Sequence, residues 1–135
     1  MSRSVRARTA PVLLVALGGA LGATLRGLLG AAAGGALLTT LAVNVAGSLA
    51  LGVILFDARA AARLPRRVRY LLGTGFLSSF TTYSTFVVDA ALATPAVAVT
   101  YVVASYAGGF GGVLAGRALV ATASGRPIRS PGDRP

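Results

Sequence analysis

The stretch GFLSSFTTYSTF, residues 75–86, concentrates hydrogen-bonding side chains inside an otherwise apolar segment. Seven of its twelve residues carry a hydroxyl, namely Ser78, Ser79, Thr81, Thr82, Tyr83, Ser84 and Thr85. Three β-branched threonines and the leading Gly73 and Gly75 weaken helicity, so a broken helix is predicted here. A break exposes backbone carbonyls, which suit a hard cation, and amide N–H groups, which suit an anion.

Other uncharged polar side chains recur at helical spacing in the neighbouring apolar segments. Thr40, Asn44 and Ser48 follow one another at intervals of four, and so do Tyr101 and Ser105. Residues at this spacing share a helix face. Within a bilayer such side chains face a partner, a cavity or a path. Asn44 could therefore line a path or form an interhelical hydrogen bond, and the hydroxyls could bond back to a carbonyl one turn earlier.

The remaining chemistry of the apolar segments comes from Arg26 and from aromatic rings. Arg26 could serve a site inside the membrane or extend its charge towards an interface. Tyr83 and Phe86 are three residues apart, and both can present the positive edge of a ring to an anion. The chain has no His, Cys or Glu, so it lacks the usual bases and nucleophiles of an enzyme. This set of groups fits a small anion that accepts hydrogen bonds strongly.

The composition is that of an integral membrane protein. The 135 residues are 55% hydrophobic and 12% charged, with a mean hydropathy of +0.76. Charges this sparse cannot coat a soluble surface. The net charge of +10 could suggest a nucleic-acid partner. Because the basic residues are all arginines that flank apolar segments, we expect a lipid bilayer as the surrounding medium and no nucleic acid.

Four apolar segments approach the roughly 20 residues that a bilayer crossing needs. They cover residues 10–33, 36–56, 70–90 and 95–116. The short connections between them make neighbouring helices antiparallel. The sequence thus predicts an all-α membrane protein with an N-terminal arm (1–9), a domain of four transmembrane helices (10–120) whose third helix is broken at mid-membrane, and a disordered tail (121–135).

Glycines at four-residue spacing predict close helix packing in a compact bundle. Gly18 and Gly22 are spaced in this way in the first segment, as are Gly108, Gly112 and Gly116 in the fourth. Small residues let helix backbones approach each other where lipid gives no hydrophobic drive to association. The Arg-rich start followed by an apolar run also has features of a secretory signal. Because that run continues to a second span, a membrane helix is the preferred interpretation.

Three motifs resemble those of the Fluc/CrcB fluoride channels. They are GGALGATLRG (18–27), LAVNVAGSLALG (41–52) and GTGFLSSFTTYSTF (73–86), within a resemblance that covers about residues 13–118. The resemblance implies a small four-span protein that forms an antiparallel dimer with two fluoride pores, and that exports fluoride from the cytoplasm to lower its toxicity. It also implies a structural sodium ion at the dimer centre, which is not transported.

The same resemblance assigns roles to individual residues. Backbone carbonyls of Ser78 and Thr81 would hold the sodium ion. The residues of the fluoride path would be Arg26, Thr40, Asn44, Tyr83, Thr85, Phe86, Tyr101 and Ser105. Two positions depart from the family pattern. Ser78-Ser79 replaces the usual Gly-Gly, which need not abolish binding by carbonyls, and Tyr83 replaces the first of two pore phenylalanines, which alters the aromatic edge.

The distribution of arginines predicts the orientation in the cell membrane. With four spans, the N-terminus, the loop at 57–69 and the C-terminus share one side, and the two opposite loops hold no arginine. The shared side carries Arg3, Arg6, Arg8, Arg59, Arg63, Arg66, Arg67, Arg69, Arg117, Arg126, Arg129 and Arg134. Both termini should therefore be cytoplasmic. An antiparallel homodimer needs one sequence to insert in both orientations. The arginine bias therefore favours a heterodimer with a homologous partner. The alternative is a homodimer whose copies insert in both orientations despite the bias.

Two other membrane functions are compatible with four short spans. A proton-coupled exporter of the small multidrug resistance type needs a carboxylate buried in the membrane. Asp57 and Asp89 lie at predicted span ends and Glu is absent, which argues against such an exporter. A purely structural membrane protein would explain the glycines but not the hydroxyl cluster of the third segment.

Overall fold

The computed structural model describes residues 3–56 and 65–123, and within them all regular secondary structure is helical. Helices α1 (Arg3–Ala32), α2 (Ala36–Phe56) and α7 (Pro95–Ala123) are long and apolar enough to cross a membrane, α1 over Thr9–Ala32. Many large apolar side chains on them are exposed, such as Leu13 and Leu38. Such a surface suits lipid better than water. The predicted class, a helical membrane protein, is confirmed.

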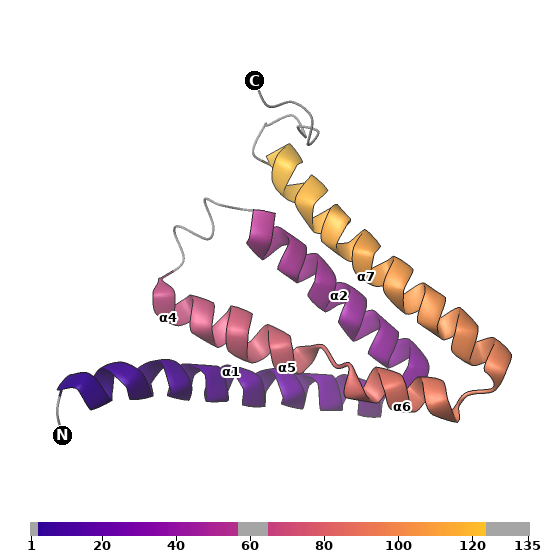
Figure 1. The fold of residues 1–135 in the computed structure, drawn as a ribbon, viewed down its shortest axis with the longest axis horizontal. Helices are drawn as coiled ribbons and strands as arrows, with labels where there is room; N and C mark the ends of the chain where they lie inside the picture. The colour runs from indigo at the N-terminus through magenta and orange to yellow at the C-terminus, as the bar shows by residue number, and fades with distance from the viewer. Residues whose placement is uncertain (1–2, 57–64, 124–135) are drawn as a thin grey trace.

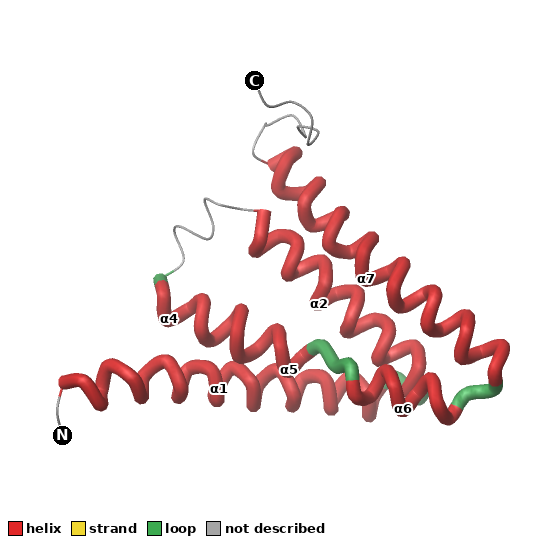
Figure 2. Tube along the Cα trace, viewed as in Figure 1, coloured by secondary structure: helices red, strands yellow, loops and turns green. Residues whose placement is uncertain are grey.

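The third apolar segment is helical but is interrupted by a loop before α6 (Figure 2). It comprises α4 (Arg66–Val68), the π-helix η1 (Arg69–Leu77), α5 (Ser78–Phe80) and, after an interruption, α6 (Ser84–Leu92). Residues 81–83 form the interruption, and Thr81 has an extended backbone with φ −77° and ψ 154°. The break predicted from the hydroxyl-rich sequence is therefore present. The π-helix before it was not predicted.

The helices are arranged as two pairs (Figure 1). Helix α1 packs along η1 and α5, and α2 packs along α7. The pairs diverge from the end of the molecule at which α6 lies, so the described chain does not close into the compact bundle expected from its glycines. The divergence leaves a cavity between the pairs, lined by residues of α2, α7 and the third segment.

Glycines allow the close approach within each pair. A Cβ atom on Gly18 or Gly22 of α1 would overlap backbone atoms of η1. On α7, Gly112 and Gly116 are buried, and a Cβ atom on either would press against backbone atoms of α2. The predicted packing role of these glycines is confirmed. Between α1 and α2, Gly34 has a φ of +63°, a left-handed conformation that favours glycine.

Several sequence boundaries differ from the observed helix ends. Helix α1 begins at Arg3, inside the segment 1–9 assigned to an arm, and α7 ends at Ala123, inside the segment 121–135 assigned to a tail. Residues 124–135, for which disorder is predicted, lie outside the described residues. The loop residues 57–64, which include Asp57, lie outside them as well.

Candidate functional site

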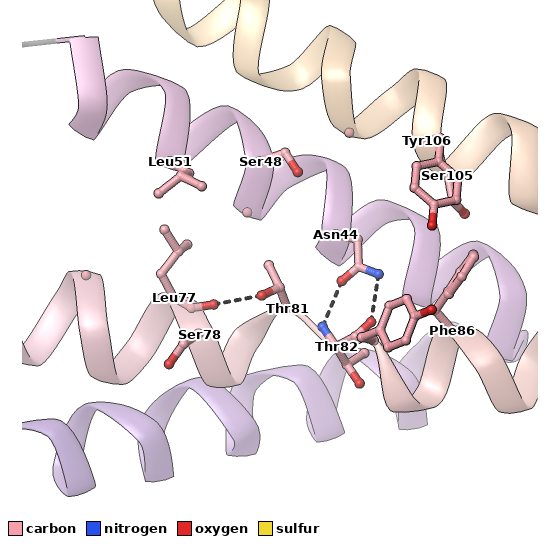
Figure 3. Close-up of a pocket in the computed structure, with 14 residues that line it drawn as sticks. Asn44, Ser48, Leu51, Leu77, Ser78, Thr81, Thr82, Phe86, Ser105 and Tyr106 are labelled. Atoms are coloured by element: carbon pink, nitrogen blue, oxygen red, sulfur yellow. Dashed lines mark hydrogen bonds between the residues drawn. The ribbon is translucent and has the colours of Figure 1, made fainter.

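The side chain of Asn44 holds the break in the third segment (Figure 3). Its Nδ2 donates to the carbonyl oxygen of Thr82 at 2.9 Å, and its Oδ1 accepts from the amide N–H of Thr82 at 2.8 Å. Asn44 thus ties α2 to non-helical backbone that would otherwise lack partners. The interhelical hydrogen bond considered for Asn44 is present. The second hydrogen on Nδ2 has no partner among the described residues and is available to a ligand.

Arg26 bridges the two sides of the break from α1. Its Nε donates to the carbonyl oxygen of Ser79 in α5 at 3.3 Å, and its Nη1 donates to Oγ1 of Thr85 in α6 at 3.2 Å. One planar guanidinium therefore joins both helical pieces. The positive charge also offsets the partial negative charge of the carbonyls at the end of the η1–α5 stretch. Arg26 points into the break, in agreement with a role in a site.

The Thr82 hydroxyl organises the start of α6. Its Oγ1 accepts from the amide N–H of Thr85 at 3.2 Å and lies 3.0 Å from Oγ1 of Thr85. By contrast, the hydroxyls of Ser78 and Thr81 bond back to carbonyls of Thr74 and Leu77 one turn earlier, as hydroxyls in helices commonly do. Thr82 was not assigned to the site from the sequence. Its place at the centre of the hydroxyl cluster is the signal that could have identified it.

Two cavities meet at Thr82, which lines both. The cavity between the helix pairs has a volume of about 480 Å³. It is lined by Asn44, Gly47, Ser48, Leu51, Gly73, Leu77, Ser78, Thr81, Thr82, Tyr83, Phe86, Ser105, Tyr106 and Gly109. The cavity beside the α1–α2 turn has a volume of about 370 Å³. It is lined by Arg26, Gly27, Gly30, Gly34, Gly35, Ala36, Thr39, Thr40, Val43, Thr82 and Thr85.

The residues predicted to line a path are thus divided between the two cavities. Asn44, Tyr83, Phe86 and Ser105 lie on the first, together with the two residues predicted to bind sodium. Arg26, Thr40 and Thr85 lie on the second. Tyr101 lines neither, but its ring contacts Phe86. Since Thr82 is common to both cavities, the break is the point at which a path between them would pass.

Phe86 is the centre of an aromatic cluster. Its ring is 8% exposed, with ring centroids at 5.7 Å from Tyr83 and 5.3 Å from Tyr101. Tyr106 of α7, which the sequence analysis did not assign to the site, packs edge-on at 6.2 Å. Tyr83 is 72% exposed, so only Phe86 of the two predicted path rings is enclosed by this chain.

A buried polar cluster lies beside Phe86. Thr40, which is 5% exposed, donates to Oδ2 of Asp89 at 2.7 Å. The hydroxyl of Tyr101 faces the side chains of Thr40, Asp89 and Ser105, but among the described residues neither Tyr101 Oη nor Ser105 Oγ makes a hydrogen bond of normal geometry. The back-bonding considered for these hydroxyls is absent. Buried polar atoms without partners are rare, and these two can donate to a ligand.

Asp89 is a further residue that sequence reasoning did not assign to the site. The sequence places it at the predicted end of a span, whereas its carboxylate lies next to buried Thr40. Its position three residues after Phe86, on the same face of α6, is the signal that could have identified it.

The carbonyl oxygens of Ser78 and Thr81 accept no hydrogen bond from the described residues. Both residues line the cavity between the helix pairs. Within the described ranges no group of three His, Cys, Asp or Glu side chains could hold a metal ion. Backbone carbonyls are nevertheless good ligands for hard cations, so these two oxygens form a candidate cation site.

Comparison with known proteins gives one consistent result. The family model described as CrcB-like protein, Camphor Resistance (CrcB), matches residues 13–117. "Fluoride-specific ion channel FluC 2" of Halobacterium salinarum is 52% identical over 113 residues, which cover 83% of this chain and 88% of that protein. "Fluoride-specific ion channel FluC 1" of Haloarcula marismortui is 50% identical over 109 residues, covering 81% and 84%. "Fluoride-specific ion channel FluC" of Chelativorans sp. is 43% identical over 106 residues, covering 72% and 85%.

Proposed function

The chain belongs to the CrcB-like family of fluoride-specific ion channels, which are not enzymes, and from this we propose that it conducts fluoride across the cell membrane, out of the cytoplasm. The observation that carries the proposal is the pair of buried hydroxyls on Tyr101 and Ser105 that make no hydrogen bond of normal geometry within residues 3–56 and 65–123. An ion that enters a narrow path must exchange its hydration shell for groups of the protein. The hydroxyls of Tyr101 and Ser105, beside the enclosed ring of Phe86, could replace water molecules in the hydration shell of a small anion.

The proposed path residues offer positive groups in and between the two cavities. The second hydrogen of Asn44 Nδ2 would donate in the cavity between the helix pairs. The hydroxyls of Tyr101 and Ser105 would donate beside the Phe86 ring, which adds the positive edge of its C–H bonds. Arg26 lines the cavity beside the α1–α2 turn, which is on the outer side when both termini are cytoplasmic, so its charge would favour an anion near the exit of the path. Each donor would replace one hydrogen bond to water with one to the protein.

A dimer and a cation complete the proposed channel. Antiparallel association of two chains would cover the cavity between the helix pairs and enclose the exposed ring of Tyr83. A sodium ion would bind the carbonyl oxygens of Ser78 and Thr81. These residues fit the ion because both carbonyl oxygens lack hydrogen-bond donors among the described residues and both residues line that cavity. The ion would supply positive charge that stabilises the dimer, and it would not be transported.

Fluoride efflux from liposomes tests the proposed function. The purified chain, with a homologous partner if it needs one, should release fluoride without a proton or drug gradient. The double variant Tyr101→Phe, Ser105→Ala should release fluoride about tenfold more slowly. Its unfolding midpoint should change little, because among the described residues neither hydroxyl makes a hydrogen bond of normal geometry. Thr100→Val is the matched control, since this exposed hydroxyl only bonds back to Ala96. Unchanged efflux in the double variant would contradict the proposed path.

We further propose that the chain is one half of a heterodimer, on the strength of its arginine bias. Among the described residues, Arg66, Arg67 and Arg69 are exposed at the start of the third segment. The guanidinium of Arg117 lies 5.5 Å from the ring centroid of Phe56, so the C-terminal ends of α2 and α7 lie together. Arginines near these ends favour their retention in the cytoplasm.

Labelling of single cysteines checks the orientation. The chain has no cysteine of its own, so one can be introduced near either terminus. When the chain is expressed alone, a membrane-impermeant reagent should label both positions from the cytoplasmic side only, and fluoride efflux should be absent. Co-expression with a homologue of opposite arginine bias should restore efflux. Labelling of the lone chain from both sides, together with efflux, would show a homodimer.

A further inference from the structure

At the break in the third segment, two amide N–H groups donate to side-chain oxygens and not to backbone carbonyls. In a continuous α-helix the Thr82 N–H would bond to the Ser78 carbonyl, and the Thr85 N–H to the Thr81 carbonyl. Here the Thr82 N–H bonds to Oδ1 of Asn44 at 2.8 Å, and the Thr85 N–H bonds to Oγ1 of Thr82 at 3.2 Å. Each side chain therefore takes the donor that would otherwise occupy one of the two carbonyls.

We infer that Asn44 and Thr82 are positioning residues of a cation site, because their side chains capture the N–H groups that would saturate the Ser78 and Thr81 carbonyls. The inference rests on the proposed function, which assigns those carbonyls to sodium. Neither side chain contacts the ion in this assignment. Their effect is to keep the carbonyl oxygens of two residues that line one cavity without a backbone donor.

Three neighbouring carbonyls are occupied by other donors. The carbonyl oxygen of Leu77 accepts from the N–H of Thr81 at 3.2 Å, and that of Ser79 accepts from Arg26 at 3.3 Å. The carbonyl oxygen of Thr82 accepts from Asn44. The carbonyl of Phe80, like those of Ser78 and Thr81, accepts no hydrogen bond from the described residues, so the break as a whole presents unpaired oxygens.

The placement of charge is compatible with a cation at these oxygens. Arg26 is hydrogen-bonded to the break and lines the cavity beside the α1–α2 turn. Ser78 and Thr81 line the other cavity. A cation bound in that cavity would share no lining residue with Arg26 except Thr82, and separation of the two charges limits their repulsion.

One consequence is a link between the cation site and the fluoride path. The same Asn44 side chain that accepts the Thr82 N–H also carries the free Nδ2 hydrogen in the cavity between the helix pairs. A bound cation would favour the backbone conformation in which Asn44 keeps both bonds to Thr82. The donor offered to the anion would then be held in a fixed orientation.

Sodium-dependent thermal unfolding of the purified full-length protein tests the inference. Sodium is varied against N-methyl-D-glucamine at constant ionic strength. A ligand that binds only the folded state raises the unfolding midpoint as its concentration increases. We expect Thr82→Val to raise the sodium concentration for half-maximal stabilisation at least tenfold. Thr82→Ser keeps the hydroxyl and should respond like the unsubstituted chain, as should Thr100→Val, the β-branched control on α7.

The possible outcomes separate the inference from the proposed function. A Thr82→Val variant with a lower midpoint but an unchanged sodium response would overturn the inference, since Thr82 would then have a structural role only. Thr82→Ala removes the same oxygen with less steric demand and gives the second measurement if Thr82→Val does not fold. An unsubstituted chain that conducts fluoride without any sodium response would remove both the sodium site and the inference, while leaving the fluoride channel intact.

Discussion

Asn44→Ala should lower fluoride efflux by roughly thirtyfold or more and should also lower the midpoint of thermal unfolding. The substitution removes two hydrogen bonds to backbone groups of Thr82 and leaves both groups unpaired. An unpaired buried donor or acceptor costs about 1–3 kcal/mol. The freed Thr82 N–H can return to the Ser78 carbonyl and extend the helix through the break. Efflux from liposomes and unfolding in detergent measure the two effects on the same preparation.

Two companion variants show which function of Asn44 matters. Ser48→Ala lies one turn further along α2 and lines the same cavity, so it controls for any loss of a polar group there. It should retain both efflux and the unfolding midpoint. Asn44→Asp keeps an acceptor for the Thr82 N–H, but when ionised it has no donor for the Thr82 carbonyl or for an anion. If the donor serves the anion, Asn44→Asp should conduct as poorly as Asn44→Ala, even though it keeps the Thr82 N–H bond. Normal efflux in Asn44→Ala, at normal protein yield, would contradict the role of Asn44 in the path.

The break was predictable from the sequence because local propensity disfavours a continuous helix there. Several hydroxyl and β-branched residues in succession compete with helical hydrogen bonds, and residues 81–83 are indeed non-helical. The π-helix η1 was not predictable in this way. Its backbone lies against Gly18 and Gly22 of α1, and a contact between distant segments leaves no periodic signal in either one.

The polar residues of the site were found more easily than their partners. Asn44 and Arg26 stand out as polar residues in apolar segments, and both prove to bond to the break. The bonds from Arg26 to Ser79 and Thr85 form only because α1 packs against the third segment. The apolar faces alone do not determine which helices pair, and hence do not predict two diverging pairs in place of a bundle. The role of Asp89 could not be predicted for the same reason, since only tertiary packing brings its carboxylate to the Thr40 hydroxyl.

Arg26→Met should reduce fluoride efflux at least tenfold, because it removes the group that joins the two helical pieces of the third segment. Methionine keeps much of the volume of the side chain but has no donor and no charge. The Ser79 carbonyl and the Thr85 hydroxyl would lose their bonds to α1, at about 1.5–3 kcal/mol for each bond to a charged group. The charge that draws anions into the cavity beside the α1–α2 turn would be lost as well.

Arg26→Lys separates these two contributions. A single ammonium keeps the charge, but it lacks the planar fork with which Arg26 reaches α5 and α6 together. If attraction of the anion dominates, Arg26→Lys should retain most of the efflux, and raising the ionic strength should slow Arg26→Lys and the unsubstituted chain alike. If bridging dominates, Arg26→Lys should lose efflux and unfold at a lower temperature, as Arg26→Met does. Arg69→Met, at an exposed position where η1 begins, is the control for the loss of one arginine. Full efflux and an unchanged midpoint in Arg26→Met would exclude both roles, because the break would then hold its shape and admit the anion without any cation from α1.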